Sequence, residues 1–162
     1  MKAAVLTLAL LLSGCGLRPL YSAGGSGPVA AALAGVEVAP IPGRAGWLVR
    51  TELEDRLGAE SRSSRYRLQI VLDDRLEGLG VRTDDAVTRE RRTLRARFQL
   101  VDATNGQVLL DDTRGSDAGI DVVGSQFATV AAEQTALERL AEDVADQIVA
   151  RLAIYARNTA AR

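Results

Sequence analysis

Two stretches of alternating side chains, 66-YRLQIVL-72 and 94-LRARFQL-100, decide the fold of this chain. In both, apolar residues occupy every second position, and polar residues fill most of the positions between them, with Val71 as the exception. Successive side chains of a β-strand point to opposite faces of a sheet, so one face of each stretch is apolar. The pattern therefore predicts two half-buried strands.

The residues around these strands predict an antiparallel meander. The segment Thr83–Val87, TDDAV, is the expected hairpin turn, and Gly78 and Gly80 indicate a bulge or bend in the first strand. The turn dipeptide Asn105-Gly106 then leads into a third apolar segment. We expect this segment to fold back antiparallel as a third strand.

A helix is predicted before the meander. Within Trp47–Leu57 the apolar residues Val49, Leu53 and Leu57 recur every four positions, charged residues fill most of the remaining positions, and Gly58 follows as a stop signal. We expect Trp47 to pack at the start of this amphipathic helix.

A second, longer helix is predicted after the meander, with Ser125 as its N-cap. Its apolar positions mix spacings of three and four: Phe127, Val130, Leu137, Ala141, Val144, Ile148, Leu152 and Tyr155. A helix of some thirty residues is ~45 Å long at ~1.5 Å per residue, enough to cross a whole sheet and extend beyond it.

The segment 36–38, VEV, predicts a short strand at or near a sheet edge, because Pro40 and Pro42 follow it. The resulting order is strand, helix, three strands, helix. This order predicts an α+β fold in which two helices pack on one face of a four-stranded, mainly antiparallel sheet and the other face is polar. We expect one domain over residues 35–158 and a C-terminal tail over 159–162.

The N-terminus has the pattern of an export signal, with Lys2 followed by the apolar run Ala3–Leu12. The sequence Leu-Ser-Gly-Cys that ends at Cys15 resembles the lipobox of bacterial lipoproteins. We therefore expect residues 1–14 to be a signal peptide and Cys15 to carry covalent lipid. Residues 15–34 form the lipidated N-terminus and a flexible Gly/Ser-rich tether. Gly16 follows Cys15 where an inner-membrane retention signal has aspartate, which favours the outer membrane.

The composition excludes several classes of function. The chain has no histidine and one cysteine, so Ser-His-Asp catalysis, Cys-His catalysis and Cys/His zinc sites are excluded. A net charge of −1 argues against a nucleic-acid partner. Carboxylate catalysis or an all-oxygen cation site stays open, but the acidic pairs are expected in turns or in solvent: Asp73-Asp74, Asp84-Asp85 and Asp111-Asp112. We therefore predict neither a metal site nor an enzyme.

The arginines are the candidate binding residues. If Leu72 lies opposite Phe98 in the hairpin, Arg75 falls beside Arg95 without an intervening carboxylate, and an anionic ligand would relieve their repulsion. In the same register Asp73 falls beside Arg97. Further arginines near the hairpin end, Arg82, Arg89, Arg91 and Arg92, extend a basic strip. The predicted ligand-binding set is Arg75, Arg91, Arg95 and Arg97; the alternative is that these charges are only solvated.

Three segments together resemble the LPS-assembly lipoproteins of Gram-negative outer membranes. They are CGLRPLY at residues 15–21, VEVAPIPGRAGWLVRTELEDRL at residues 36–57, and SQFATVAAEQTALERLAEDVADQIVARLAIYA at residues 125–156. The last of these is similar to the closing helix of alphaproteobacterial members. The likeness covers nearly all of the expected mature chain.

The resemblance implies a lipid-anchored plug subunit inside the large outer-membrane LPS-assembly β-barrel. Such a subunit assists the assembly of the barrel, binds lipopolysaccharide (LPS) during its delivery to the outer leaflet, and catalyses no reaction. The implied partners are the barrel, LPS and the membrane, and the implied cofactor is none beyond the lipid on Cys15. Two alternatives stay open: an auxiliary lipoprotein of a periplasm-spanning lipid or solute transport complex, and a carboxylate-dependent hydrolase.

Overall fold

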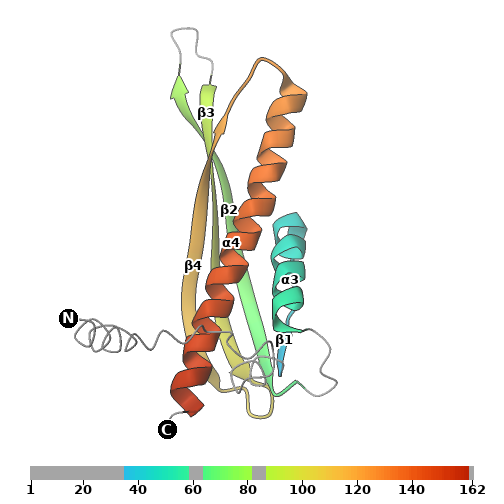
Figure 1. Ribbon diagram of the computed structural model, residues 1–162, viewed down its shortest axis with the longest axis vertical. Coiled ribbons are helices and arrows are strands. Elements are labelled where there is room, and N and C mark those ends of the chain that lie inside the picture. Colours follow the sequence, from blue (N-terminus) through green and yellow to red (C-terminus); the bar gives the residue numbers. More distant parts are fainter. Residues whose placement is uncertain (1–34, 59–63, 82–86, 161–162) are drawn as a thin grey trace, which may run out of the picture.

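The structure, a computed structural model, describes residues 35–58, 64–81 and 87–160. These residues form four strands and two helices in the predicted α+β order. The elements are β1 (Val36–Val38), α3 (Gly43–Leu57), β2 (Tyr66–Val81), β3 (Val87–Asp102), β4 (Val108–Asp121) and α4 (Gln126–Ala160). Figure 1 shows the two helices side by side along the sheet.

The strands form one mixed sheet in the order β1-β2-β3-β4. β2, β3 and β4 are an antiparallel meander, and β1 pairs parallel to β2 at the edge, as expected for a short strand followed by prolines. The predicted turn between β3 and β4 is present. Gly106 adopts a φ of 74°, which favours glycine, and its N–H donates to the carbonyl of Asp102 at 2.9 Å.

The predicted register of the hairpin is wrong by two residues. Ile70 faces Phe98, and Leu72 faces Ala96. A shift of two residues leaves every side chain on its original face, so alternation alone cannot distinguish the two registers. The predicted bulge is absent at Gly78, which pairs in register with Glu90, and the described β3–β4 pairing has a register shift at Leu100/Val101. Most of the predicted turn lies outside the described residues.

The helix α3 begins at Gly43, four residues earlier than predicted, directly after Pro42. Its first turn fits closely against the preceding chain, since a Cβ atom on Gly46 would lie 2.5 Å from the carbonyl oxygen of Ile41. The helix ends as predicted: Gly58 takes a φ of 72° and its N–H donates to the carbonyl of Glu54 at 3.0 Å.

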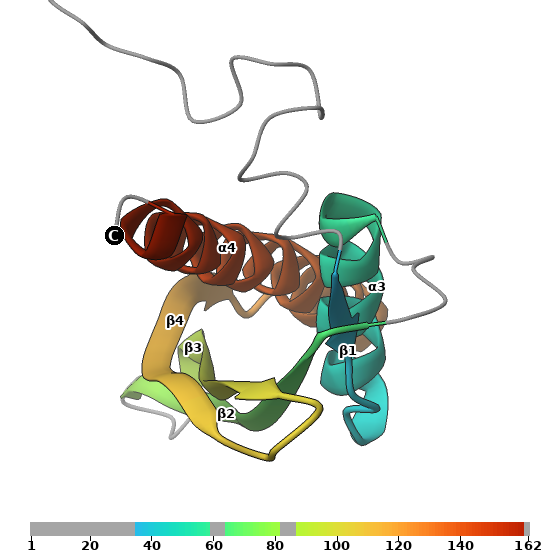
Figure 2. The same cartoon turned by 90° about the horizontal axis from the view of Figure 1, so that it is seen from below.

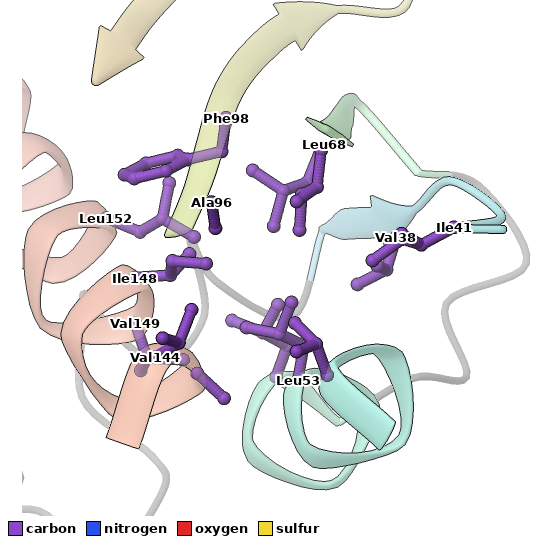
Figure 3. Packing of buried hydrophobic residues seen from close by; sticks show 14 of the residues in the cluster. Val38, Ile41, Leu53, Leu68, Ala96, Phe98, Val144, Ile148, Val149 and Leu152 are labelled. Carbon is purple, nitrogen blue, oxygen red and sulfur yellow. The ribbon is translucent and has the colours of Figure 1, made fainter. Parts of the chain in front are cut away.

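Both helices cover the same face of the curved sheet (Figure 2). The core between them and the sheet is built from apolar side chains, including Phe98, Leu68, Leu53 and Ile148, all fully buried (Figure 3). The helices run parallel, since Arg44 near the start of α3 lies 3.7 Å from Glu138 and Arg56 near its end lies 2.6 Å from Asp146.

The helix α4 is much longer than α3. Its 35 residues span ~52 Å at ~1.5 Å per residue, and it extends past α3 toward the end where β3 begins (Figure 1). We name this end of the molecule distal and the opposite end proximal. From Ala136 onward α4 contributes many buried residues to the core, whereas within residues 126–135 only Thr129 is buried.

Candidate functional site

The face of the sheet away from the helices is polar and exposed, as predicted. Odd-numbered residues of β2, β3 and β4 point to this face, and we refer to it as the polar face. Most of its side chains are charged or amide-bearing, with Val71 as an exposed exception. The four predicted binding arginines all lie on the polar face, so their positions relative to aspartates decide which of them can bind a ligand.

Arg75 is held by a carboxylate on its own strand. Its Nε donates to Asp73 Oδ1 at 3.0 Å, and its Nη2 lies 2.9 Å from Asp73 Oδ2. In the register, Asp73 lies opposite Arg95, and Arg75 lies opposite Thr93. The prediction that Arg75 and Arg95 lie side by side without a carboxylate is therefore wrong, because the two-residue shift places Asp73 between their positions.

Arg97 is bound by a carboxylate on the neighbouring strand β4. Its Nε and Nη2 donate to the two carboxylate oxygens of Asp111 at 3.2 and 2.9 Å, and Gln99 donates to the same carboxylate at 2.7 Å. The hydrogen bond from Arg97, followed by that from Gln99, lowers the pKa of Asp111 below its usual range. The predicted pairing of Asp73 with Arg97 is wrong, since Val71 lies opposite Arg97.

Three cross-strand pairs join arginines of β3 to aspartates of β4 on the polar face. They are Arg89–Asp121 at 3.1 Å, Arg91–Asp117 at 4.0 Å and Arg97–Asp111 at 2.9 Å. The Arg91 contact is the loosest. The Arg91 and Arg97 contacts are diagonal, since Gly119 and Thr113 lie directly opposite these arginines, and Gly115 lies opposite Arg95.

Arg95 lies opposite that glycine. A Cβ atom on Gly115 would lie 3.0 Å from Arg95 Cγ, so the side chain of Arg95 passes close over β4 there. Arg95 makes no ion pair within the described part of the chain. It lines two adjoining hollows of about 400 and 160 Å³, which also share Thr93. Of the four predicted arginines, Arg95 is the one without an ion pair among the described residues, and Arg91 has only the loose contact to Asp117.

The other arginines of the predicted strip do not extend it. Arg92 points to the helix side, where it donates to both carboxylate oxygens of Asp74 at 2.9 and 2.7 Å and to the carbonyl of Glu133 at 3.1 Å. Arg89 is paired as described above. Arg82 lies outside the described residues. The structure thus reduces the predicted strip to a row of ion pairs with one open position.

Neighbouring aspartates point to opposite sides of the sheet, as the strand geometry requires. Asp111 is bound by Arg97 on the polar face, whereas Asp112 on the helix side accepts from Arg151 of α4 at 2.7 Å and from Arg114 at 2.9 Å. The sequence analysis missed this Asp112 cluster, because no local pattern links residues 112 and 151. Asp84-Asp85 lies outside the described residues, and among those described no group of three metal-ligating residues comes together.

Two further predictions concern partner contacts. Trp47 does not pack at the start of α3 as predicted: 65% of its surface is exposed. Cys15, the signal peptide and the tether lie outside the described residues, so the lipid on Cys15 stays a prediction. In the described part of the chain, no helix is long and apolar enough to cross a bilayer.

Comparison with known proteins identifies the family. The model of the lipopolysaccharide-assembly family LptE matches residues 33–152, which is well over half of the 162 residues. The chain belongs to the lipopolysaccharide-assembly family. Membership confirms the resemblance inferred from the sequence and places the chain among lipoproteins of LPS assembly at the outer membrane. No curated protein matches the sequence.

Solved structures agree with this family and fold. A structure from Caulobacter crescentus CB15, described as a lipoprotein, is 26% identical with a TM-score of 0.69, over 82% of this chain and 98% of that one. A minor lipoprotein from Acinetobacter baumannii shares the fold at 16% identity and a TM-score of 0.62, over 74% and 90%. Rare lipoprotein B from Shewanella oneidensis does so at 13% and 0.55, over 76% and 96%.

Proposed function

We propose that this LPS-assembly protein is anchored in the outer membrane by lipid on Cys15 and plugs the LPS-assembly β-barrel. In this role it assists the assembly of the barrel and binds LPS during delivery to the outer leaflet, and it catalyses no reaction. The family match supports the general role. The polar face supports the plug, because the lumen of a large outer-membrane barrel is lined by polar side chains.

The observation that supports LPS binding is that Arg95 on the polar face makes no ion pair within the described residues. LPS bears phosphates, and the planar guanidinium of arginine binds a phosphate through two parallel hydrogen bonds. Arg75 and Arg97 already use their donors on Asp73 and Asp111, so a phosphate would have to displace a carboxylate there. Arg95 makes no ion pair in the described part of the chain, although Asp73 lies opposite it, and Thr93 in the same hollow offers a hydroxyl donor.

The test compares Arg95→Ser with Arg97→Ser, two substitutions on the same strand and face. Loss of a charge-assisted hydrogen bond of roughly 1.5 kcal/mol weakens binding about tenfold. We expect Arg95→Ser to raise the Kd for purified LPS by about that factor and Arg97→Ser to change it less than about twofold. With dephosphorylated LPS the difference between the variants should vanish. Equal losses in both variants would rule out a specific role of Arg95.

The plug role is tested separately by mild solubilisation of membranes and affinity purification of the full chain. We expect a large outer-membrane barrel and LPS to co-purify. Recovery of an ATPase-linked permease in place of the barrel would show that the chain is a transport-complex subunit and that the proposed role is wrong. Exposed Trp47 provides a second probe, because Trp47→Ala should reduce barrel recovery if α3 faces the lumen wall.

A further inference from the structure

The strand β4 is an edge strand of 14 residues, and among the described residues no strand lies along one side of its backbone. The hydrogen bonds of Thr113 show which residues face this free side. Its N–H donates to Asp112 Oδ1 at 2.7 Å, and its carbonyl accepts from Arg114 Nη1 at 2.8 Å, so neither group is used by β3. Backbone groups of a strand alternate in direction, so residues 113, 115, 117, 119 and 121 all face outward.

The middle of this free edge is covered by side chains of the protein itself. The two groups of Thr113 are bonded as described, and the carbonyl of Gly115 accepts from Gln147 of α4 at 3.4 Å. Asp112 is in turn fixed by Arg151. Proteins often cover edge strands in this way, because an open edge can pair with another chain.

The distal part of the edge has no such cover. Within the described residues, no side chain or backbone group bonds the outward N–H or carbonyl of Asp117, Gly119 or Asp121. Residues 115–121, GSDAGID, contain no lysine or proline, and the β3–β4 pairing has no bulge there. Side chains that cover the backbone are thus present around Thr113 and absent beyond Gly115, where the charges of Asp117 and Asp121 are the protection that the edge carries.

We propose that the distal edge, residues Asp117–Asp121, accepts an extended segment of the barrel partner as an additional β-strand. This inference rests on the proposed function. The outward backbone N–H and carbonyl groups without a partner repeat at every second residue along the strand. An extended polypeptide backbone matches that spacing, whereas a phosphate or an acyl chain does not. The occupant is therefore a protein strand.

The charges of the distal edge favour a partner strand over a second copy of this chain. If two copies paired antiparallel around Gly119, Asp117 of each would lie opposite Asp121 of the other, and like charges in that position are destabilising. Both carboxylates are well exposed, at 67% and 79%. A strand with basic or polar residues on the polar-face side and apolar residues on the helix side fits the edge.

The adjoining surface supports the same location. Val123 and Phe127 follow the edge directly in the sequence and are 50% and 90% exposed. Exposed apolar side chains beside an open edge offer a partner apolar contact as well as backbone hydrogen bonds. In Figure 1 the end of β4 and the start of α4 lie together at the distal end of the molecule.

Amide hydrogen exchange in the purified full-chain complex with the barrel tests the proposal. The outward amides of Asp117, Gly119 and Asp121 should exchange at least about tenfold more slowly in the complex than in the free protein. The inward amides of Ala118 and Ile120 already bond to β3, so they serve as internal controls. If the barrel co-purifies but the outward amides are unchanged, the strand proposal is wrong and the proposed function stands.

A pair of variants provides an independent test. Gly119→Pro removes an outward N–H and leaves the bonds to β3 intact, and proline is tolerated at such edge positions. Gly119→Ala keeps the N–H, and its Cβ meets nothing within 4 Å. We expect Gly119→Pro to retain several-fold less barrel than Gly119→Ala. If both variants retain equal amounts of barrel, the proposal is wrong. It is also wrong if the outward amides of the chain without barrel become protected as the protein concentration rises, because a second copy then occupies the edge. If the unmodified chain retains no barrel, both the proposal and the proposed function are wrong.

Discussion

The chain contains two phenylalanines, and their surroundings differ completely. Phe98 in β3 is fully buried between the sheet and α4, whereas Phe127 in the first turn of α4 is 90% exposed. Phe98 lies where α3 and α4 together close over the sheet (Figure 3), and the first turn of α4, which contains Phe127, lies beyond the start of α3 (Figure 1). The difference shows that the extent of α3 determines how much of the long sheet has an apolar core.

The helix side of the distal half is correspondingly polar. Where the proximal strands present leucine and phenylalanine, the distal strands present Asp74, Glu90 and Arg92. Arg92 joins Asp74 to the backbone of α4 at Glu133, and one carboxylate oxygen of Glu90 is buried without a hydrogen-bond partner among the described residues. The proximal half is thus stabilised by an extended apolar core, whereas the distal half combines buried Ile120 with a few ionic contacts.

The largest expected effect distinguishes the two phenylalanines. Phe98→Ala should lower the free energy of unfolding by about 3–5 kcal/mol, because it leaves a cavity in the packed core. Phe127→Ala is the matched control and should change it by less than about 0.5 kcal/mol. Urea denaturation followed by circular dichroism measures both. Similar losses in the two variants would mean that the distal half has a core of its own.

A smaller effect is expected at the ionic contact of the distal half. Arg92→Ala removes the bonds to Asp74 and to the carbonyl of Glu133, with side chains only 16% and 26% exposed in the pair. The loss should be about 1–2 kcal/mol, between the values for exposed and buried pairs. Amides at the start of α4 should exchange faster in this variant. Arg91→Ala, which removes the loose contact to Asp117, should leave them unchanged.

The smallest effect concerns pH. The hydrogen bond from Arg151, and next that from the N–H of Thr113, lowers the pKa of Asp112 below its usual value. A folded-state pKa below the unfolded value of about 3.9 stabilises the fold above that pH, and this stabilisation is lost as the pH falls through the folded pKa. The chain has no histidine, so the urea midpoint should be flat from about pH 8 to 5 and fall below about pH 4.

The matched variant for this measurement is Asp112→Asn. Its urea midpoint should be lower than that of the unmodified chain at pH 7, and the two should converge in acid. Asp117→Asn, whose contact to Arg91 is 4.0 Å long, should follow the unmodified curve. A curve for Asp112→Asn that runs parallel to the unmodified one at all pH values would show that Asp112 is not linked to stability.

The sequence predicted the elements and their layers well and the register between the strands poorly. The alternation around Ile70 and Phe98 identified the strands and their buried face, but a two-residue shift preserves both. The start of α3 was missed because Gly43 and Gly46 carry no apolar periodicity and have low helix propensity. The open position at Arg95 depends on Gly115 of another strand, so only the register of β3 with β4 could reveal it.

The cover on Thr113 also has a consequence for size. Because Gln147 occupies the outward carbonyl of Gly115, and Asp112 and Arg114 occupy both outward groups of Thr113, a strand that pairs from the distal end meets occupied positions after residues 117–121. Those five residues span roughly 16 Å at ~3.3 Å per residue. The length of the open edge therefore limits the partner segment: a strand longer than about five residues has to leave the edge before Gly115, and a shorter one leaves part of the edge in water.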